Sequence, residues 1–326
     1  MSQMPFGAAV IGTEHAHATG NLRSIQLSKH FELVAVAEPN EALRRIAESN
    51  PRWADVPWTD VDAIFSDDRI QMVCVETDPL ESLPYAERAV EAGKHVRIDK
   101  PPGADYRRLA KIYDEAQRRH LIIQVAYIFR YQPAFELAYR AIRENWFGSV
   151  RAAVCQMNDL PGPKDRKKVD RFPGGQMFEI CCHMVDALIW LLGKVTRVTP
   201  ILRHSDPVDD QLEDDVMAIF EFEPAVAVVK SCTRNRIRYF EILGDAGGIR
   251  IGVSGRPQTV QLTLSKPHGN FKTGVQNVPV DSADGFLPDL EELAAAIREH
   301  RPLQYFDPEH DLTVHRALLT ASGLDV

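Results

Sequence analysis

The sequence predicts an α/β protein with two domains: a doubly wound parallel sheet, then an α+β domain with an open, mainly antiparallel sheet. Five short apolar runs alternate with helix-length amphipathic segments up to about residue 125, and the later apolar runs follow one another too closely for helices to separate them. The length of 326 residues also exceeds what one hydrophobic core usually organises. We therefore expect domains at residues 1–125 and 126–326.

The apolar runs of the first half have the length and β-rich composition of parallel strands. Their positions are residues 8–11, 32–37, 71–75, 95–98 and 121–125. The segment 85–92 between two of them has helical composition and ends at Gly93, a typical helix stop. Strands that alternate with helices build a parallel sheet, and ligands of such sheets bind at the carboxyl ends of the strands.

The second half has the closely spaced strand patterns of an antiparallel sheet. Residues 149–154 form an isolated strand pattern, whereas 216–222 and 225–230 are separated only by Glu223-Pro224 and predict a hairpin. A glycine-rich turn follows at residues 244–248. This half is therefore expected to be α+β.

Composition excludes several classes of protein. Hydrophobic content of 44% and charged content of 26% are ordinary for a globular chain. The formal net charge is −8, and the only compact basic run, 166–168, has acidic neighbours, so we expect no nucleic-acid partner. No apolar stretch approaches the ~20 residues that span a bilayer, and the N-terminus lacks a signal-peptide pattern. Five cysteines without a Cys-x-x-Cys pair favour a reducing compartment, so we expect a cytoplasmic protein.

The first predicted strand runs into residues 12–17, Gly-Thr-Glu-His-Ala-His, where a dinucleotide-binding domain has its glycine-rich turn. Only the first glycine of G-x-G-x-x-G is present, and Glu14 puts a negative side chain where a pyrophosphate would approach. Two interpretations stay open: the turn is displaced and binds weakly or through water, or His15 and His17 donate hydrogen bonds that offset Glu14. The expected cofactor contacts of this turn are Gly12, Thr13, Glu14 and His15.

The second predicted strand ends at Glu38, about 26 residues after Gly12. An acidic side chain there accepts hydrogen bonds from the adenosine ribose and repels a 2′-phosphate, which favours NAD over NADP. The alternative is a solvated turn residue before Pro39. Thr77, just past the third strand, is either a further cofactor contact or a plain turn residue.

The fourth predicted strand is followed by Asp99-Lys100-Pro101, which puts a lysine at the carboxyl edge of the sheet. An isolated lysine is usually a solvated surface charge. Lys100 becomes a candidate functional residue because of this position and because of a second feature downstream, at residues 174–193.

Residues 174–193 predict a glycine turn, one helix and a glycine stop. Glu179, His183 and Asp186 stand at i, i+4 and i+7, on one helical face. One interpretation is a buried histidine hydrogen-bonded to Asp186, and another is a metal site formed by the three side chains. An acid/base site is the simplest, so we expect no metal, but the pair His15 and His17 keeps a metal site open as an alternative.

In this order the motifs resemble those of the Gfo/Idh/MocA family, named for glucose-fructose oxidoreductase and inositol dehydrogenase, over nearly the whole chain. Residues 93–101 resemble its G-K-H-V and E-K-P motifs, with Asp99 in place of glutamate. Residues 129–133 resemble its R-[FY]-x-P segment, 174–193 resemble its D-x-G-x-H-x-x-D helix, and 286–323 resemble its C-terminal helix pair.

The resemblance implies a Rossmann domain, with Lys100 anchoring the substrate hydroxyl and the nicotinamide ribose beside Asp99, and His183 as general base. Glu179 takes the place of a supporting aspartate. Histidine titrates near working pH and an ammonium group stabilises a developing alkoxide, which suits alcohol oxidation. Glu179 is longer than aspartate and Cys181 replaces a glycine of the family pattern, which puts the placement of the substrate in question.

Position along the chain also selects candidate substrate contacts. Arg130 could meet a carboxylate or hydroxyl, or it could be a structural ion-pair partner. The other candidates are Tyr127, Asn158, Arg171 and Asp186.

We therefore expect an NAD-dependent dehydrogenase that acts on a secondary alcohol of a sugar, cyclitol or related polyol. An enzyme that oxidises transiently for epimerisation or elimination would use the same residues. A non-catalytic sensor or scaffold that retains the fold would suit the altered turn at Glu14. The open sheet of the second domain exposes a face that could pair, so we expect a homodimer or homotetramer.

Overall fold

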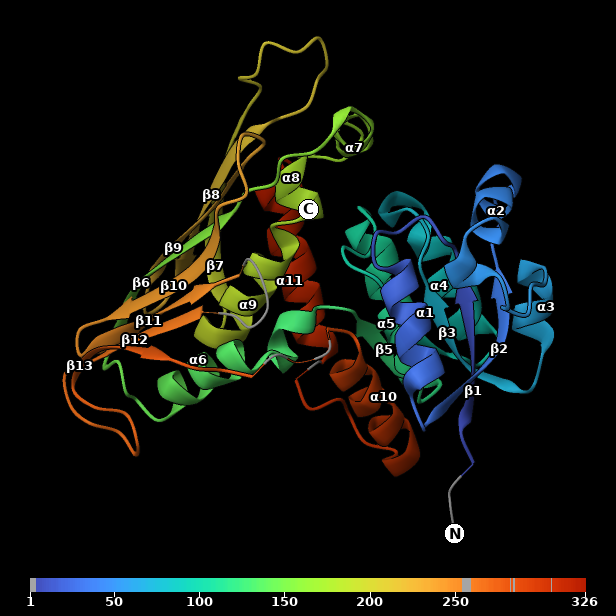
Figure 1. The fold of residues 1–326 in the computed structure, drawn as a ribbon, viewed down its shortest axis with the longest axis horizontal. Coiled ribbons are helices and arrows are strands. Elements are labelled where there is room, and N and C mark those ends of the chain that lie inside the picture. Colours follow the sequence, from blue (N-terminus) through green and yellow to red (C-terminus); the bar gives the residue numbers. More distant parts are fainter. Residues whose placement is uncertain (1–3, 254–258, 282, 284, 306) are drawn as a thin grey trace. The chain divides into compact units, whose positions relative to one another are not determined.

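The computed structural model describes residues 4–253, 259–281, 283, 285–305 and 307–326. They form two compact units, the first built from residues 1–128 and 284–308 and the second from residues 129–283 and 309–326 (Figure 1). This division differs from a single boundary after residue 125, because the chain returns to the first unit near its end.

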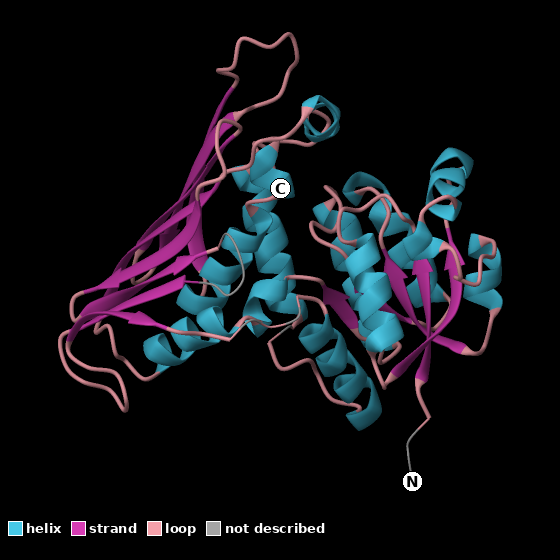
Figure 2. Cartoon of the chain, viewed as in Figure 1, coloured by secondary structure: helices cyan, strands magenta, loops and turns pink. Residues whose placement is uncertain are grey.

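The first unit contains a five-stranded sheet in which every pair of neighbouring strands is parallel (Figure 2). The strands are β1 (Phe6–Ile11), β2 (Phe31–Ala37), β3 (Ile70–Val75), β4 (His95–Ile98) and β5 (Ile123–Val125). Their order is β2-β1-β3-β4-β5, so the winding reverses beside β1. This is the predicted doubly wound sheet, and the reversal point is where such sheets bind ligands.

Helices follow the strands of this sheet along the chain, and a further helix, α10, returns to the unit from near the end of the chain and packs against α1. They are α1 (Ala18–Leu27), α2 (Glu41–Glu48), α3 (Val61–Ser66), α4 (Ser82–Glu91), α5 (Tyr106–Arg118) and α10 (Leu287–Glu299), with short 3₁₀ turns η1 (Pro51–Trp53) and η2 (Pro79–Glu81). The predicted helix before Gly93 is thus confirmed as α4. Gly93 has φ +73°, a left-handed conformation that ends a helix at little cost in glycine.

A buried ion pair explains why residues 284–308 belong to the first unit. Arg97 in β4 donates to Asp289 in α10 (Nη2 to Oδ2, 2.8 Å), and both side chains are at most 1% exposed. Gln124 in β5 donates to the backbone carbonyl of Asp289 (2.8 Å). A charge in an otherwise apolar strand requires such a partner, because an unpaired buried charge is strongly destabilising.

The second unit contains an eight-stranded sheet of order β13-β12-β11-β10-β6-β9-β8-β7. The strands are β6 (Val150–Met157), β7 (Val195–Arg203), β8 (Asp215–Phe222), β9 (Val226–Cys232), β10 (Arg238–Gly244), β11 (Gly247–Gly252), β12 (Thr259–Leu264) and β13 (Gly274–Val278). Every pair of neighbours is antiparallel except β6 and β9. The predicted hairpin around Glu223-Pro224 is confirmed as β8–β9.

Helices of the second unit gather on one face of this sheet (Figure 2). They are α6 (Pro133–Arg143), α7 (Pro163–Val169), α8 (Gln176–Glu179), α9 (Cys182–Leu192) and α11 (Pro308–Ala321), with a 3₁₀ turn η3 (Ile128–Tyr131) before α6. Along β8 the side chains alternate between buried and half-buried, as expected of a strand covered on one side. The predicted C-terminal helix pair exists as α10 and α11, but the two helices belong to different units.

The prediction of one helix across residues 174–193 is wrong, because α8 and α9 are separate. The backbone N–H of Cys181 donates to the carbonyl of Gln176 (3.0 Å), five residues back, and that of Met184 donates to Cys181 (2.8 Å), three residues back. A wide turn followed by a tight one interrupts the regular hydrogen-bond ladder of an α-helix. Glu179 and His183 therefore do not share one uninterrupted helical face.

Among the described residues, none of the helices combines the length and apolarity that crossing a membrane requires.

His95, at the start of β4, makes stability depend on pH. Its Nδ1 accepts the backbone N–H of Ile122 (3.0 Å), and burial, with the nearby charge of His300, lowers the pKa of His95 from 6.5 to about 4. Between these values the unfolded chain binds the proton and the folded chain does not, so stability falls as the pH falls through this window.

Replacing His95 by glutamine should remove part of this acid sensitivity. We expect the free energy of unfolding lost between pH 7 and about pH 4.5 to be roughly 1–2 kcal/mol smaller in His95→Gln than in the wild type, after allowing for partial exposure. Urea denaturation at both pH values measures this difference. The control is His120→Gln at an exposed position, and equal losses in His95→Gln and the wild type would contradict the assignment.

Candidate functional site

Gly12 begins the turn that leaves β1 at the carboxyl edge of the parallel sheet. Its φ is +94°, and an added Cβ would lie 2.5 Å from the backbone nitrogen of Thr77, so both conformation and space require glycine here. The turn is tied down by the backbone N–H of Gly12, which donates to the carbonyl of Ala37 (2.8 Å), and by that of His15, which donates to Glu76 (3.0 Å). The ends of β1, β2 and β3 therefore meet at this turn.

Glu38 lies at the end of β2, where 7% of its surface is exposed, and its carboxylate is hydrogen-bonded to the same turn. Oε2 accepts from the backbone nitrogen of Thr13 (2.7 Å) and from its Oγ1 (2.8 Å). Oε1 accepts from the backbone of Asn40 (2.9 Å). Glu38 is therefore a fixed, largely buried acid and not the solvated turn residue of the alternative interpretation.

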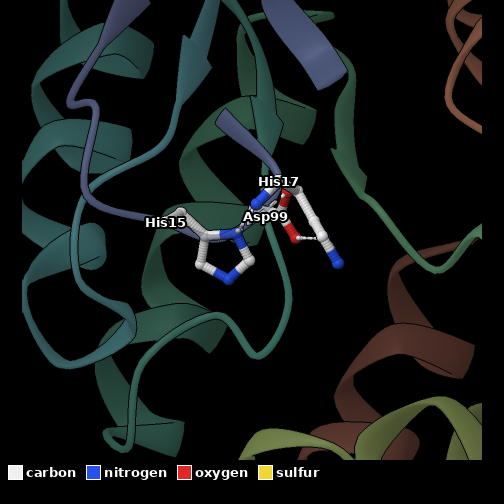
Figure 3. Close-up of side chains that lie close together, drawn as sticks. All are labelled: His15, His17 and Asp99. Atoms are coloured by element: carbon white, nitrogen blue, oxygen red, sulfur yellow. Dashed lines mark hydrogen bonds and ion pairs between the residues drawn. The ribbon is translucent and has the colours of Figure 1, made fainter. Parts of the chain in front are cut away.

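His15 and His17 turn their rings toward Asp99 at the end of β4 (Figure 3). The Nδ1 atom of His17 lies 3.0 Å from Oδ1 of Asp99, and that of His15 lies 3.4 Å from Oδ2. His15 also donates from Nε2 to the carbonyl of Lys100 (3.1 Å) and accepts the backbone N–H of His17 at Nδ1 (3.2 Å). Both ring nitrogens of His15 are thus used within this cluster and not on Glu14.

A second carboxyl lies beneath this cluster. Asn21 in α1 donates from Nδ2 both to Oε1 of Glu76 (2.6 Å) and to Oδ2 of Asp99 (2.9 Å). Burial and the charge of Asp99 raise the pKa of Glu76 well above its usual range. Burial acts in the same direction on Asp99, but positive charge on the adjacent His15 and His17, when their rings are protonated, outweighs it and holds the pKa of Asp99 well below its usual range. The pair therefore favours one ionised and one protonated carboxyl.

Lys100 follows Asp99 and is only 2% exposed, so it is not a solvated surface lysine. Its backbone N–H donates to Oδ1 of Asp99 (2.7 Å), and the Lys100-Pro101 peptide bond is cis. Thr77 is likewise buried at the end of β3. The carboxyl edge thus gathers most of the predicted cofactor residues within one unit. Glu14 is half-buried in the same turn.

In the second unit, His183 lies in the first turn of α9 with 4% exposure. Its ring stacks on that of Phe129, with centroids 4.8 Å apart and an interplanar angle of 26°. Glu179 is half-buried at the end of α8, and its backbone carbonyl accepts from Sγ of Cys182 (3.3 Å). Gly174 has φ +62°, and an added Cβ would lie 2.7 Å from Cα of Ser322, so the glycine lets the segment before α8 pack against the end of α11.

Arg130 and Asp186 form a buried ion pair, which is the structural alternative considered for Arg130. Both side chains are 0% exposed. Nε of Arg130 donates to both carboxylate oxygens of Asp186, at 3.1 Å each. Nη2 of Arg130 donates to Asp186 as well, and to Oδ1 of Asp311 at 3.1 Å. His310 approaches the same carboxylate, with Nε2 3.3 Å from Oδ1. Burial alone would raise the pKa of Asp186, but the charge of Arg130 holds it below its usual value. Their hydrogen-bonding capacity is committed to the fold.

Asn158 is also engaged by its own unit and is 3% exposed. Its Oδ1 accepts from the backbone of Cys232 (3.0 Å) and from Gln156, and its Nδ2 donates to Asn235 (2.6 Å). Tyr127 is buried just after β5, whereas Arg171 is exposed after α7. The five predicted substrate residues therefore occupy quite different environments, and Arg171 is the most accessible of them.

Comparison with known proteins identifies the family. Residues 6–127 match the oxidoreductase family with an NAD-binding Rossmann fold, and residues 135–250 match the Gfo/Idh/MocA C-terminal domain. The chain belongs to the Gfo/Idh/MocA oxidoreductase family. The resemblance drawn from its motifs is thereby confirmed.

Relatives of this Gfo/Idh/MocA chain include sugar-modifying enzymes. A dTDP-3,4-didehydro-2,6-dideoxy-alpha-D-glucose 3-reductase of Streptomyces violaceoruber is 28% identical over 186 residues, 56% of this chain and 54% of the relative, so the match spans about half of that enzyme. A D-xylose 1-dehydrogenase (NADP(+)) of Haloferax volcanii is 24% identical over 231 residues, covering 70% of this chain and 69% of the relative.

The fold is shared with solved structures over nearly the whole chain. Levoglucosan dehydrogenase in complex with NADH and levoglucosan superposes with a TM-score of 0.82 at 20% identity, covering 98% of each chain. At this identity the likeness establishes the architecture, and substrate has to be argued from the site.

Sequence reasoning missed several residues around the turn of this Gfo/Idh/MocA oxidoreductase. Asn21 and Glu76 were not singled out, and neither was the link from Arg97 to Asp289. A charged side chain inside the apolar strand β4 was a usable signal for a buried ion pair. Nothing local identified Asp289 or Asp311 as the partners, because each lies about 180 residues or more from the arginine that it binds.

The Arg130–Asp186 pair predicts a large stability effect. Asp186→Ala leaves a fully buried guanidinium with fewer partners, so we expect the free energy of unfolding to fall by about 3–5 kcal/mol. Asp215→Ala, which breaks the exposed pair with Arg203, should cost about 1 kcal/mol or less. Urea denaturation measures both. A stable Asp186→Ala protein with altered substrate affinity would instead support substrate contact.

Proposed function

We propose that this chain is an NAD(H)-dependent oxidoreductase that transfers a hydride between nicotinamide and a secondary alcohol of a sugar, cyclitol or related polyol. In this proposal Lys100 anchors the substrate hydroxyl, His183 acts as general acid and base, and Glu179 supports His183. The observation that carries the proposal is a buried lysine, Lys100, at the carboxyl edge of the parallel sheet beside the Gly12 turn.

The residues of the first unit fit a dinucleotide with an unphosphorylated ribose. The close-packed Gly12 turn precedes the amino end of α1, where backbone N–H groups favour a phosphate. Glu38 accepts three hydrogen bonds from the protein, and a carboxylate has about four acceptor positions. One position therefore remains for a ribose hydroxyl, and its charge disfavours a 2′-phosphate. Thr13, Glu14, His15, Thr77 and Asp99 complete the proposed cofactor contacts.

Lys100 and His183 have complementary chemistry for alcohol oxidation. The bound cofactor would supply the hydride acceptor. The Lys100 ammonium group donates hydrogen bonds to the hydroxyl oxygen and stabilises negative charge as the proton leaves. His183, held by its stack on Phe129, takes that proton and returns it in the reverse reaction. Tyr127 and Arg171 remain proposed substrate contacts.

The sugar-like substrate class rests on the activities named for the relatives, which act on sugars or nucleotide sugars. An epimerase or lyase that uses the cofactor transiently would need the same Lys100 and His183, and it differs only in leaving no net NADH. We also infer a cytoplasmic homodimer or homotetramer from the cysteine content and from the one-sided sheet of the second unit.

Substitution of the two proposed catalytic residues provides the direct test. With NAD and a panel of sugars and polyols, Lys100→Met should lower kcat/KM by about 10²–10³ and His183→Gln by about 10²–10⁴, without loss of folding. NADH formation and circular dichroism are the measurements. Lys94→Met and His315→Gln replace another buried lysine and histidine as controls, and both should stay near wild type.

Three outcomes decide between the functions. NADH formed with a polyol, and lost in both variants, supports the dehydrogenase. Conversion of a sugar without net NADH would support the epimerase or lyase. Failure of NAD, NADH, NADP and NADPH alike to raise the melting temperature would overturn the proposal and favour a non-catalytic scaffold.

Glu38 should set the preference between the two cofactors. Glu38→Gln removes the charge that opposes a 2′-phosphate, so we expect the ratio of NADP to NAD affinity to rise about tenfold or more, or about 1.4 kcal/mol. Calorimetric titration of both nucleotides measures the ratio. The exposed neighbour Glu41→Gln is the matched control, and an unchanged ratio in Glu38→Gln would remove Glu38 from the discrimination.

A further inference from the structure

The cluster in Figure 3 has the composition and spacing of a metal site. One nitrogen of His15, one of His17 and a carboxylate oxygen of Asp99 all lie within 4.8 Å of one another. The shortest distances to Asp99 are 3.0 Å for His17 Nδ1 and 3.4 Å for His15 Nδ1. Ligand atoms around a tetrahedral Zn²⁺ lie about 3.3 Å apart, given metal–ligand bonds of about 2.0–2.1 Å. The three side chains therefore need little movement to bind one ion.

The hydrogen bonds of His15 define its tautomer. A backbone carbonyl can only accept, so Nε2, which bonds to the carbonyl of Lys100, carries the proton. A backbone N–H can only donate, so Nδ1, which receives the N–H of His17, carries a lone pair. In this neutral form the Nδ1 atom lies 3.4 Å from a carboxylate oxygen of Asp99, which is also an acceptor, and an ion bound at Nδ1 would replace the N–H of His17 as the partner of its lone pair. Two acceptors this close are stabilised by a cation that both can bind.

Glu76 provides an independent sign of a ligand at the same place. Its side chain is 0% exposed, and Oε1 is used by Asn21 (2.6 Å) and Cys74 (3.2 Å). Its other oxygen, Oε2, has no hydrogen-bond partner among the described residues and lies 3.9 Å from Nδ1 of His15. An unsatisfied buried oxygen costs about 1–3 kcal/mol, so a fourth ligand role would remove a real penalty.

The groups around the cluster resemble the outer shell of a metal centre. Metal-binding histidines usually donate their second ring N–H to a carbonyl or carboxylate, as His15 does to Lys100. Asn21 and the backbone N–H of Lys100 orient the carboxylate of Asp99. The side chain of His17 is 23% exposed, which gives an ion a path from solvent.

We propose that His15, His17 and Asp99 bind a divalent transition-metal ion, Zn²⁺ by ligand preference, and that Glu76 loses its proton to solvent and turns toward the ion as the fourth ligand. Two imidazole nitrogens and carboxylate oxygens suit Zn²⁺, whereas Mg²⁺ and Ca²⁺ prefer oxygen ligands alone. The second group of this kind, Asp186, His310 and Asp311, is different because Arg130 already provides the positive charge between its carboxylates. The site departs from the expectation of no metal.

The ion would also change the charge of the dinucleotide turn. Two neighbouring buried carboxyls cannot both ionise at low cost without positive charge beside them. A divalent ion supplies that charge within the segment where Glu14 replaces a glycine of the G-x-G-x-x-G pattern. One proposed ligand, His17, stands where the third glycine of that pattern would be.

Metal titration of the full chain tests the proposal. Protein stripped with a chelator is titrated with Zn²⁺ by calorimetry and with Co²⁺ by visible absorption, without nucleotide or substrate, so the result is independent of the proposed oxidoreductase activity. We expect one ion per chain and the intense visible bands of tetrahedral Co²⁺. His17→Gln, at the most accessible ligand, should weaken Zn²⁺ binding on the order of 100-fold, with circular dichroism unchanged.

His310→Gln is the matched control, because it removes the histidine of the second group. It should leave the stoichiometry and affinity unchanged. The proposal is overturned if the wild type binds no ion, if Co²⁺ gives only the weak bands of an octahedral, water-rich ion, or if His310→Gln abolishes binding while His17→Gln retains it. X-ray absorption of the Zn²⁺ form should count two imidazole ligands, and a count of none would also overturn it.

Discussion

The buried ion pair between Arg97 and Asp289 is the constraint on which the nucleotide edge of the first unit depends. It places a guanidinium inside a parallel sheet, where desolvation is severe and every donor needs an acceptor. Arg97 bonds to Asp289, to Gln124 and to Oδ1 of Asn21. By holding that oxygen, it turns the Nδ2 of Asn21 toward Glu76 and Asp99. The carboxyls under the turn are thus positioned by a helix from near the end of the chain.

The turn above them uses side chains where a dinucleotide fold more often uses bare backbone. Glycines permit close approach of a phosphate to amide groups, whereas here only Gly12 is retained and histidines occupy the following positions. Thr13 is fastened to Glu38 and His15 to Lys100, so the turn is ordered by polar contacts with the ends of β2 and β4. The turn is therefore held in place by side-chain hydrogen bonds and not by close backbone packing alone. As a result, the imidazoles of His15 and His17 face the carboxylate of Asp99.

The second unit shows how a charged motif can serve the fold. Asp186 matches the family pattern in position, yet it is fully buried against Arg130, with Asp311 from α11 completing the charge balance. This pair ties α9 to the segment before α6 and to the last helix of the chain. His183 therefore lies in a helix that is fixed one turn further on by ionic contacts, and its ring is restrained by Phe129. Such restraint suits a residue that must be held in one orientation.

The sequence by itself determined the five parallel strands of the first unit, the β8–β9 hairpin of the second and the family, because apolar periodicity and glycine turns are local properties. It also placed Lys100, Glu38 and Gly12 at the edge of the sheet. In a doubly wound fold the carboxyl ends of the parallel strands all lie along one edge, so a residue that follows a strand is located by its place in the sequence. Regular helical spacing across residues 174–193 was misleading, because the interruption at Cys181 appears only in the backbone hydrogen bonds.

Only the tertiary structure decided which charges meet. The partners Arg97 and Asp289, and Arg130 and Asp311, are separated by 192 and 181 residues, and a pattern confined to a short window contains no information about such pairs. The same limit hid Asn21 and Glu76, whose contacts with Asp99 depend on three segments converging at one edge. Periodicity in the sequence determines which face of a helix or strand is buried. Which residues contact that face is determined by the packing of the whole chain.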